Sequence, residues 1–285
     1  NSKKDYFNYI TRRSDIIIGT KLNDNIKSGG GDDSINGKGG SDILDGQSGV
    51  DTAIFDGEFN DYSFSRGSEN LTISNSNDGT KCILNNFEFV QFLDQNIEES
   101  KVDKHITYSG KFNDYKFYNR GNNQYEIKHD SGFDDITGIP KINFSDKTIS
   151  AIADIKQTFD QIIDKDDVTG KTFRLYNAAF ARFPDSDGLK YWIKQRSSGD
   201  NSERNVALSF LASPEFKNLY GKNVSHSTFV NNLYENILGR GADEAGLNYW
   251  VNNLSNGLEE RHLVLLGFSE SAENKALFTE ITGFS

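Results

Sequence analysis

Residues 28–54 read SGGGDDSINGKGGSDILDGQSGVDTAI and repeat one pattern every nine residues. Each unit holds a glycine-rich turn, an aspartate and, two residues later, an apolar residue. Followed outward, the step of nine holds for five aspartates: Asp15, Asp24, Asp33, Asp42 and Asp51. The apolar residues keep the same register: Ile17, Ile26, Ile35, Leu44 and Ala53. This pattern predicts a parallel β-roll in which two units form one coil.

The coil geometry stacks turns that lie two units apart. Neighbouring strands lie about 4.8 Å apart, so the stacked pairs are Asp33 with Asp51, Asp24 with Asp42, and Asp15 with Asp33. Two unit charges at that spacing repel by roughly 1 kcal/mol in water and by several times more near a protein surface. A hard divalent cation between the layers replaces this repulsion with a net attraction. Calcium prefers carboxylate and carbonyl oxygens, which this turn supplies.

The pattern therefore predicts two to three Ca²⁺ sites. The predicted ligands are Asp24, Asp33, Asp42, Asp51 and Asp15, with backbone carbonyls near Gly29, Gly31, Gly37, Gly39, Gly46 and Ser48. The turn at Gly19 has Leu22 where the pattern expects glycine, and the turn before Asp15 departs further. Whether Asp15 binds calcium stays open. A flexible Gly/Asp/Ser linker is the alternative, but a linker needs no apolar residue in register.

Residues 19–54 resemble the RTX, or hemolysin-type, calcium-binding repeats, whose pattern is G-G-x-G-x-D-x-apolar-x. The resemblance implies a secreted bacterial protein, exported by a type I, one-step system that reads an uncleaved C-terminal signal. No N-terminal signal peptide is visible, which agrees with that route. The 285 residues include no methionine, which indicates a portion of a longer protein.

Composition excludes several partner classes. The formal net charge of −11 argues against nucleic acid and anionic membrane surfaces as partners. No apolar run reaches membrane-spanning length. Cys82 is the single cysteine, so no internal disulfide is possible, and we expect a buried strand thiol.

We expect a multidomain β plus α protein. The predicted parts are a calcium-binding parallel β-roll, duplicated antiparallel β-modules and a C-terminal α-helical domain, over residues 10–55, 56–100, 101–150 and 151–285. The module motif GEFNDYSF at 57–64 recurs as GKFNDYKF at 110–117. We expect these modules to cover the open end of the roll, since an uncovered edge invites aggregation. The alternation of Tyr62 and Phe64 favours packing over a sugar-binding face.

The helical region is duplicated at a step of 58. RFPDSDGLKYW at 182–192 recurs as RGADEAGLNYW at 240–250, which gives repeats over about 168–221 and 226–285. Asp185 and Asp243 stand at helix N-cap positions rather than in a calcium loop. Trp192 and Trp250 lie on apolar stripes, which predicts core positions. The repeats resemble an uncharacterised helical family that recurs beside RTX repeats.

No enzyme motif stands out in the chain. We find no nucleophile elbow, phosphate loop, cysteine–histidine signature or zinc cluster, so we expect a non-enzymatic protein. The first interpretation is a calcium-dependent extracellular structural or cell-surface protein, S-layer-like or part of a matrix, whose partners are calcium and further copies of itself. The alternatives are an adhesin module that binds cell-surface glycans, or the C-terminal secretion and stability region of a larger RTX toxin or hydrolase.

Overall fold

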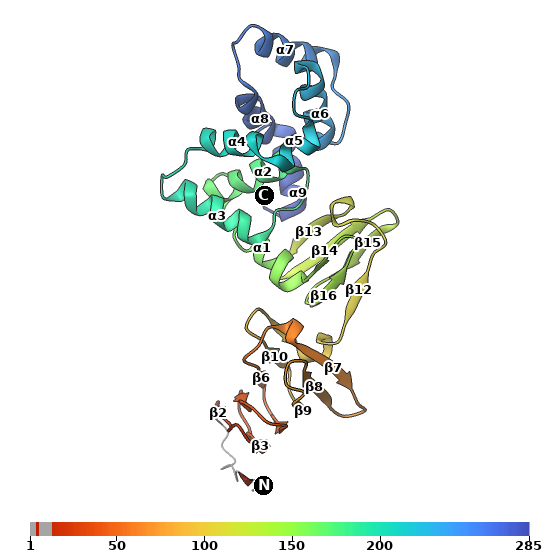
Figure 1. The fold of residues 1–285 in the computed structure, drawn as a ribbon, viewed down its shortest axis with the longest axis vertical. Helices are drawn as coiled ribbons and strands as arrows, with labels where there is room; N and C mark the ends of the chain where they lie inside the picture. Colours follow the sequence, from red (N-terminus) through yellow and green to blue (C-terminus); the bar gives the residue numbers. More distant parts are fainter. Residues whose placement is uncertain (1–3, 6–12, 285) are drawn as a thin grey trace. The chain divides into compact units, whose positions relative to one another are not determined.

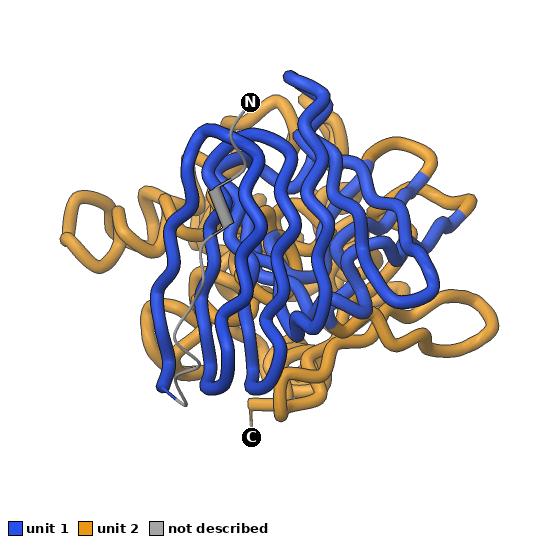
Figure 2. Tube along the Cα trace, turned by 90° about the horizontal axis from the view of Figure 1, so that it is seen from below, with its two compact units in different colours: residues 1–108, 138–144, 148–153 blue, residues 109–137, 145–147, 154–285 orange. Residues whose placement is uncertain are grey.

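The computed structural model describes residues 4–5 and 13–284, and its chain forms two compact units (Figures 1 and 2). Unit 1 comprises residues 1–108, 138–144 and 148–153, and unit 2 comprises 109–137, 145–147 and 154–285. The β plus α class is confirmed. Residues 101–150, predicted as one module, contribute to both units. Residues 10–12 of the predicted roll, and Ser285, lie outside the described residues.

Unit 1 begins with a roll of very short strands. These are β1 (Lys4–Asp5), β2 (Ile16–Ile18), β3 (Asp24–Lys27), β4 (Ser34–Asn36), β5 (Ile43–Asp45) and β6 (Thr52–Ile54). The chain alternates between two sheets, so that β2, β4 and β6 pair in parallel on one side while β1, β3 and β5 pair in parallel on the other. From β2 to β6, paired residues lie 18 apart, which is two units of nine as the pattern predicts, whereas β1 pairs with β3 at a step of 20.

The inward apolar residues hold the two sheets together. Ile26, Ile35, Leu44 and Ala53 are each almost fully buried, and they belong to one hydrophobic cluster. Burying one such large side chain stabilises the fold by roughly 1.5–3 kcal/mol. A strand of three or four residues has little stability alone, so the coils depend on stacking against one another.

The first β-module continues both sheets of the roll. It comprises a 3₁₀ helix (Phe59–Asp61), β7 (Tyr62–Arg66), β8 (Leu71–Asn75), β9 (Lys81–Asn85), β10 (Phe89–Gln91), β11 (Asn96–Glu98) and a second 3₁₀ turn (Glu99–Lys101). β9 pairs in parallel with β5, and β10 pairs in parallel with β6. The first module therefore covers the end of the roll, as expected, whereas the strands of the second module form separate sheets.

The predicted antiparallel pairing holds for the strand pairs within the first module, but the sheets that the module joins are mixed. β7, β8 and β9 form an antiparallel meander, and β11 closes antiparallel on β10. The sheets are mixed because β9 and β10 must follow the direction of the roll strands whose free edges they satisfy. Tyr62 packs its ring 5.3 Å from the ring centroids of both Phe55 and Phe92, which supports packing over a sugar-binding face.

The second module repeats the local structure of the first. It comprises β12 (His105–Thr107), a 3₁₀ helix (Phe112–Asp114), β13 (Lys116–Gly121), β14 (Gln124–His129), β15 (Gly132–Asp135), β16 (Lys141–Asn143) and β17 (Thr148–Ile149). The Gly57 N–H donates to the Tyr62 hydroxyl, and the Gly110 N–H donates to the Tyr115 hydroxyl, both at 3.1 Å. β12, β16 and β17 form a sheet in unit 1, whereas β13 to β15 form an antiparallel sheet in unit 2.

Helices make up most of unit 2. After a π-helix (Ala151–Lys156), which begins in unit 1, and α1 (Gln157–Phe159) come α2 (Val168–Phe180), α3 (Ser186–Ser197), α4 (Glu203–Ala212), α5 (Pro214–Tyr220), α6 (His226–Leu238), α7 (Glu244–Ser255), α8 (Arg261–Ser269) and α9 (Ala272–Thr282). The step of 58 carries the first residues of α2 to α5 onto those of α6 to α9, which confirms the internal repeat. One core cluster takes buried residues from both repeats.

The two aspartates of the repeat act as helix N-caps, as predicted. The Asp185 carboxylate accepts from the Gly188 N–H at 2.7 Å, and Asp243 accepts from the Gly246 N–H at 2.8 Å. The tryptophans pack at the core. The Trp192 ring contacts Phe210, and the Trp250 ring contacts Phe268, with centroids 5.2 and 5.7 Å apart.

Removing either cap should destabilise the helices without involving calcium. Asp185→Ala and Asp243→Ala should each lower the free energy of unfolding by about 1 kcal/mol. Asp185→Ala should cost more, because Asp185 also accepts from the Tyr176 hydroxyl. Urea titration followed by circular dichroism at the helix band, in calcium and in chelator, measures both losses. A loss that appears only in calcium would show that these residues are metal ligands.

Candidate metal centre

One edge of the roll carries a column of buried carboxylates. Asp33 and Asp51 are 1% and 0% exposed, and each immediately precedes a strand of the same sheet. Asp33 Oδ1 accepts from the Asp15 N–H, and Asp51 Oδ1 accepts from the Asp33 N–H, both at 2.8 Å. Each bond joins one coil to the next. The structure thus brings Asp15, Asp33 and Asp51 into one column, which we call the first aspartate column.

In this column, Asp33 and Asp51 each have a second carboxylate oxygen without a protein partner. Oδ2 of Asp33 and Oδ2 of Asp51 are both buried without a hydrogen bond. A buried ionised carboxylate is costly unless it is paired or bound to a metal. Burial, with the nearby charges of Asp33 and Glu88, raises the pKa of Asp51 to about 6. These two oxygens are therefore positioned to bind a cation, which would compensate their buried charge.

The opposite edge holds Asp24 and Asp42, the second aspartate column. Asp42 Oδ1 accepts from the Asp24 N–H at 2.9 Å. Asp24 Oδ2 accepts from the N–H of Thr20 at 2.6 Å and from its hydroxyl at 2.9 Å. The turn at Gly19, which departs from the glycine pattern, is thus stabilised by hydrogen bonds to the Asp24 carboxylate. Burial, with the nearby charge of Asp24, raises the pKa of Asp42 to about 6.

Glycines let the backbone of one turn approach the next. Gly31 and Gly49 have positive φ angles, 113° and 147°. A Cβ at Gly49 would lie 2.0 Å from the Gly31 carbonyl oxygen, and a Cβ at Gly31 would lie 2.4 Å from that of Arg13. A Cβ at Gly37 would lie 2.2 Å from Asp42 Oδ2. Any other residue would fill the space between turns that holds these oxygens.

Several of the predicted carbonyls accept hydrogen bonds in the turns. The oxygens of Gly29, Gly37 and Ser48 accept from the backbone N–H groups of Ser48, Gly39 and Gly31, and the oxygen of Gly46 accepts from the Ser28 hydroxyl. A carbonyl oxygen has two lone pairs, so those of Gly37, Gly46 and Ser48 can also bind a cation, whereas that of Gly29 accepts a second hydrogen bond from the Ser48 hydroxyl.

Sequence reasoning missed Glu88, which extends the first aspartate column. Glu88 Oε2 accepts from the Asp51 N–H at 2.7 Å. Phe89 lies opposite Thr52 in the β10–β6 pair, so Glu88 precedes β10 as Asp51 precedes β6. The nine-residue step ends at Asp51, so spacing alone gave no signal. Only the pairing of β10 with β6 assigns Glu88 to the column.

The second aspartate column ends differently. Ile83 lies opposite Ile43 in the β9–β5 pair, which gives Cys82 the position after Asp42. Cys82 is buried in β9, as predicted. Burial, with the charge of Asp42, raises the pKa of its thiol well above the usual value. The next position of the second aspartate column after Asp42 is therefore a neutral thiol, whereas the next position of the first column after Asp51 is a carboxylate.

The donor set fits a hard cation. Carboxylate and carbonyl oxygens in glycine turns are the ligands that calcium takes. Over residues 4–5 and 13–284, no three His, Cys, Asp or Glu side chains gather in a metal-binding arrangement. An ion held between two coils would therefore take its remaining ligands from backbone carbonyls. In the same range, no helix is long and apolar enough to cross a membrane.

Comparison with known proteins identifies two families within the chain. Residues 13–53 match the RTX calcium-binding nonapeptide repeat, and residues 159–219 and 207–278 match a domain of unknown function, DUF4214. The first match confirms the repeat family that the sequence predicted. The second agrees with a two-part helical domain of an uncharacterised family.

Whole-chain comparisons add little. No curated protein matches the chain. Among solved structures, the crystal structure of extracellular lipase LipA from Serratia marcescens shares 16% identity over 43% of this chain and 18% of the lipase, with a TM-score of 0.27. A likeness at that level carries no argument about this chain.

The raised pKa values predict an unusual pH dependence in chelator. Asp42 and Asp51 titrate near pH 6 in the folded roll and near pH 4 when unfolded. Between those values the folded state binds more protons, so the free energy of unfolding should fall as pH rises. Urea unfolding in chelator at pH 5 and pH 7.5 measures this change in the free energy of unfolding. Asp51→Asn should make the change smaller. A wild-type roll that is more stable at pH 7.5 in chelator would contradict it.

Proposed function

We propose that the chain is a calcium-dependent extracellular structural protein without enzymatic activity. The observation that carries the proposal is the pair of buried oxygens, Asp33 Oδ2 and Asp51 Oδ2, that have no protein partner. Such an arrangement is unfavourable for a roll that works without a cation and favourable for one that folds around it.

The principal calcium site lies along the first aspartate column, between the coils of Asp33 and Asp51. A second lies between Asp24 and Asp42, where Asp24 already accepts hydrogen bonds within its own turn. We therefore expect tighter binding at the first. Asp15 would contribute to a third site at the start of the column, where its carboxylate is only half-buried.

The calcium affinity that is typical of extracellular modules supports an extracellular location. Extracellular calcium modules bind with Kd of about 10⁻⁴–10⁻³ M. The roll would be loose at cytosolic calcium levels, which suits export of an unfolded chain, and would order outside the cell. At a hundredfold excess over Kd, each independent site adds about 2.7 kcal/mol of stability.

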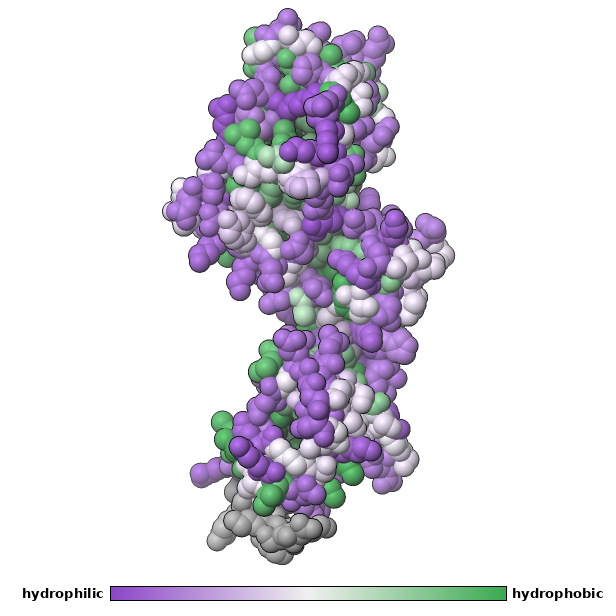
Figure 3. All heavy atoms as spheres, in the orientation of Figure 1, coloured by the Kyte–Doolittle hydropathy of each residue, from purple (hydrophilic) through white to green (hydrophobic). Residues whose placement is uncertain are grey.

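A structural role at the cell surface accounts for the remaining features. The net charge is −11, and the face shown in Figure 3 is mostly hydrophilic, with small scattered hydrophobic patches. Acidic copies repel one another over about 10 Å at moderate salt, until divalent ions bridge or neutralise them. The two helical repeats offer two similar surfaces per chain. We propose assembly into an S-layer-like or matrix structure.

The calcium part of the proposal predicts a graded effect of aspartate substitutions. Asp51→Asn should weaken calcium binding by at least the roughly 10- to 100-fold that loss of an outer-shell partner costs, because it removes a charged ligand. Asp45→Asn is the matched control, because Asp45 lies in the same segment but forms an ion pair with Lys27 and accepts from the Gln47 N–H. Calorimetric calcium titration measures both. Equal losses for the two variants would contradict the assignment of Asp51.

The assembly part has its own test. Electron microscopy of the purified protein should show ordered sheets or filaments in millimolar calcium that disperse in chelator. Sedimentation velocity over the same calcium range gives an independent size. A strictly monomeric protein at every calcium concentration would rule out assembly and leave the calcium sites unaffected.

A further inference from the structure

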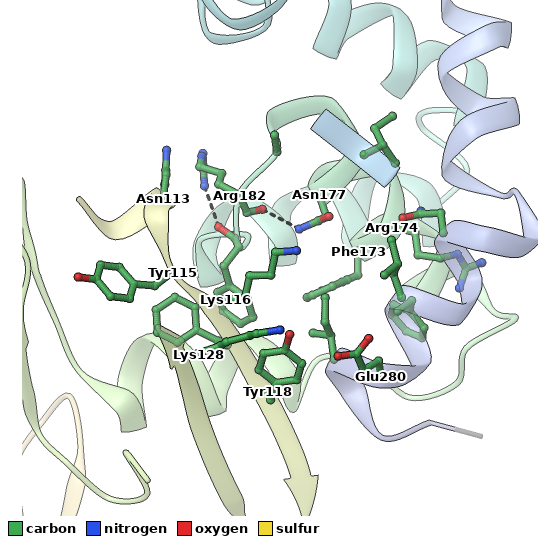
Figure 4. Close-up of a pocket in the computed structure, with 18 of the residues that line it drawn as sticks. Asn113, Tyr115, Lys116, Tyr118, Lys128, Phe173, Arg174, Asn177, Arg182 and Glu280 are labelled. Carbon is green, nitrogen blue, oxygen red and sulfur yellow. Dashed lines mark hydrogen bonds between the residues drawn. The ribbon is translucent and has the colours of Figure 1, made fainter. Parts of the chain in front are cut away.

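A cavity of about 280 Å³ lies within unit 2, and its lining includes no residue of the calcium columns (Figure 4). It is lined by β13, by α2 and the loop after it, by the end of α6 and by α9. Its lining includes aromatic residues whose side chains are almost fully buried, among them Phe117, Tyr118 and Phe173. Its volume is just below the ~300–1,000 Å³ that is typical of small-molecule pockets.

Two lysines meet at this cavity. Lys116 on β13 lies directly opposite Lys128 on β14, and both line the cavity. Figure 4 shows the two ammonium groups extending to the same side, toward α2 and α9. Like charges directly opposite across an antiparallel pair are destabilising. Within residues 4–5 and 13–284 neither lysine forms an ion pair, and Lys128 Nζ lies 5.6 Å from the centroid of the Phe133 ring.

The first β-module shows that the fold does not require this charge pair. In that module the equivalent cross-strand pair is Ser63 with Ser74, at the same positions of the same hairpin. The lysines therefore appear only in the copy whose hairpin borders the cavity. A repulsive pair at that one place points to an anion that binds there.

The other charges of the cavity set the charge of that anion. Arg174 donates from Nε and Nη2 to the Glu270 carboxylate at 2.8 and 2.7 Å, and Arg182 donates in the same way to Glu215 at 2.6 and 3.2 Å. These pairs leave the two lysines and one lining carboxylate, Glu280. The unpaired charge is thus about +1. It suits a monoanion, and Glu280 disfavours a dianion such as a phosphate ester.

We propose that this cavity binds the carboxylate-bearing ring of an acidic sugar. Lys116 and Lys128 hold the carboxylate. Side-chain amides at the rim, from Asn113, Asn177 and Asn236, supply donors and acceptors for hydroxyl groups. Asn177 already donates its N–H to the Arg182 carbonyl, which leaves its amide oxygen to accept. This site uses no residue of the calcium columns, so its test is independent of the proposed function.

Calorimetric titration of the intact protein with glucuronate tests the proposal, with glucose and glucose 6-phosphate as the neutral and phosphorylated comparisons. Glucuronate should bind most tightly. Lys116→Ser with Lys128→Ser, the residues of the first module, should weaken binding about tenfold or more. Glu280→Gln should strengthen it by about two- to fivefold. Lys190→Ser with Lys222→Ser is the matched control, because both lysines are exposed in unit 2 outside the cavity.

The double variant of the cavity should melt no lower than the wild type without sugar, because the substitution removes a repulsion. Loss of glucuronate binding in a variant that melts normally then reports on the site alone. Three results would overturn the proposal: no binding of glucuronate at tens of millimolar, equal binding of glucose, or tighter binding of glucose 6-phosphate.

Discussion

The roll depends on burying carboxylates at the places where its coils stack. Each coil is joined to the next by a backbone N–H that donates to an aspartate oxygen, as between Asp33 and Asp51. The bond holds the turns in register, but it also draws a charged group out of water. At Asp33 and Asp51 the N–H satisfies one carboxylate oxygen, and the other oxygen is buried without a protein partner. A calcium ion is the counter-charge that the geometry and the oxygen donors fit.

The same constraint explains how the roll ends. Parallel coils would leave two free strand edges, and the first β-module covers both by adding β9 and β10. The carboxylate columns end with that covering, in Glu88 on one side and in the neutral thiol of Cys82 on the other. A further carboxylate, Glu88, stands only at the end of the first aspartate column, where it accepts from the Asp51 backbone N–H. The module therefore completes the roll electrostatically as well as sterically.

Much of this follows from short-range periodicity in the sequence. The step of nine predicts the coils and their inward residues, and the step of 58 predicts the paired helices and their caps at Asp185 and Asp243. Long-range strand pairing was not predictable in the same way. The positions of Glu88 and Cys82 and the mixed sheets all depend on which strands pair and in which register. No local pattern encodes that choice, because it is decided by which free edges the folded roll presents.

Hydrogen exchange of the intact protein, with and without calcium, tests the central claim most directly. Calcium should slow exchange in β3 to β6, because binding stabilises the folded roll over its open states. The amides of α2 to α9 should exchange alike in both conditions, since their caps and core contain no calcium column. Equal exchange in β3 to β6 with and without calcium would contradict the account. So would a calcium effect of similar size across the helices.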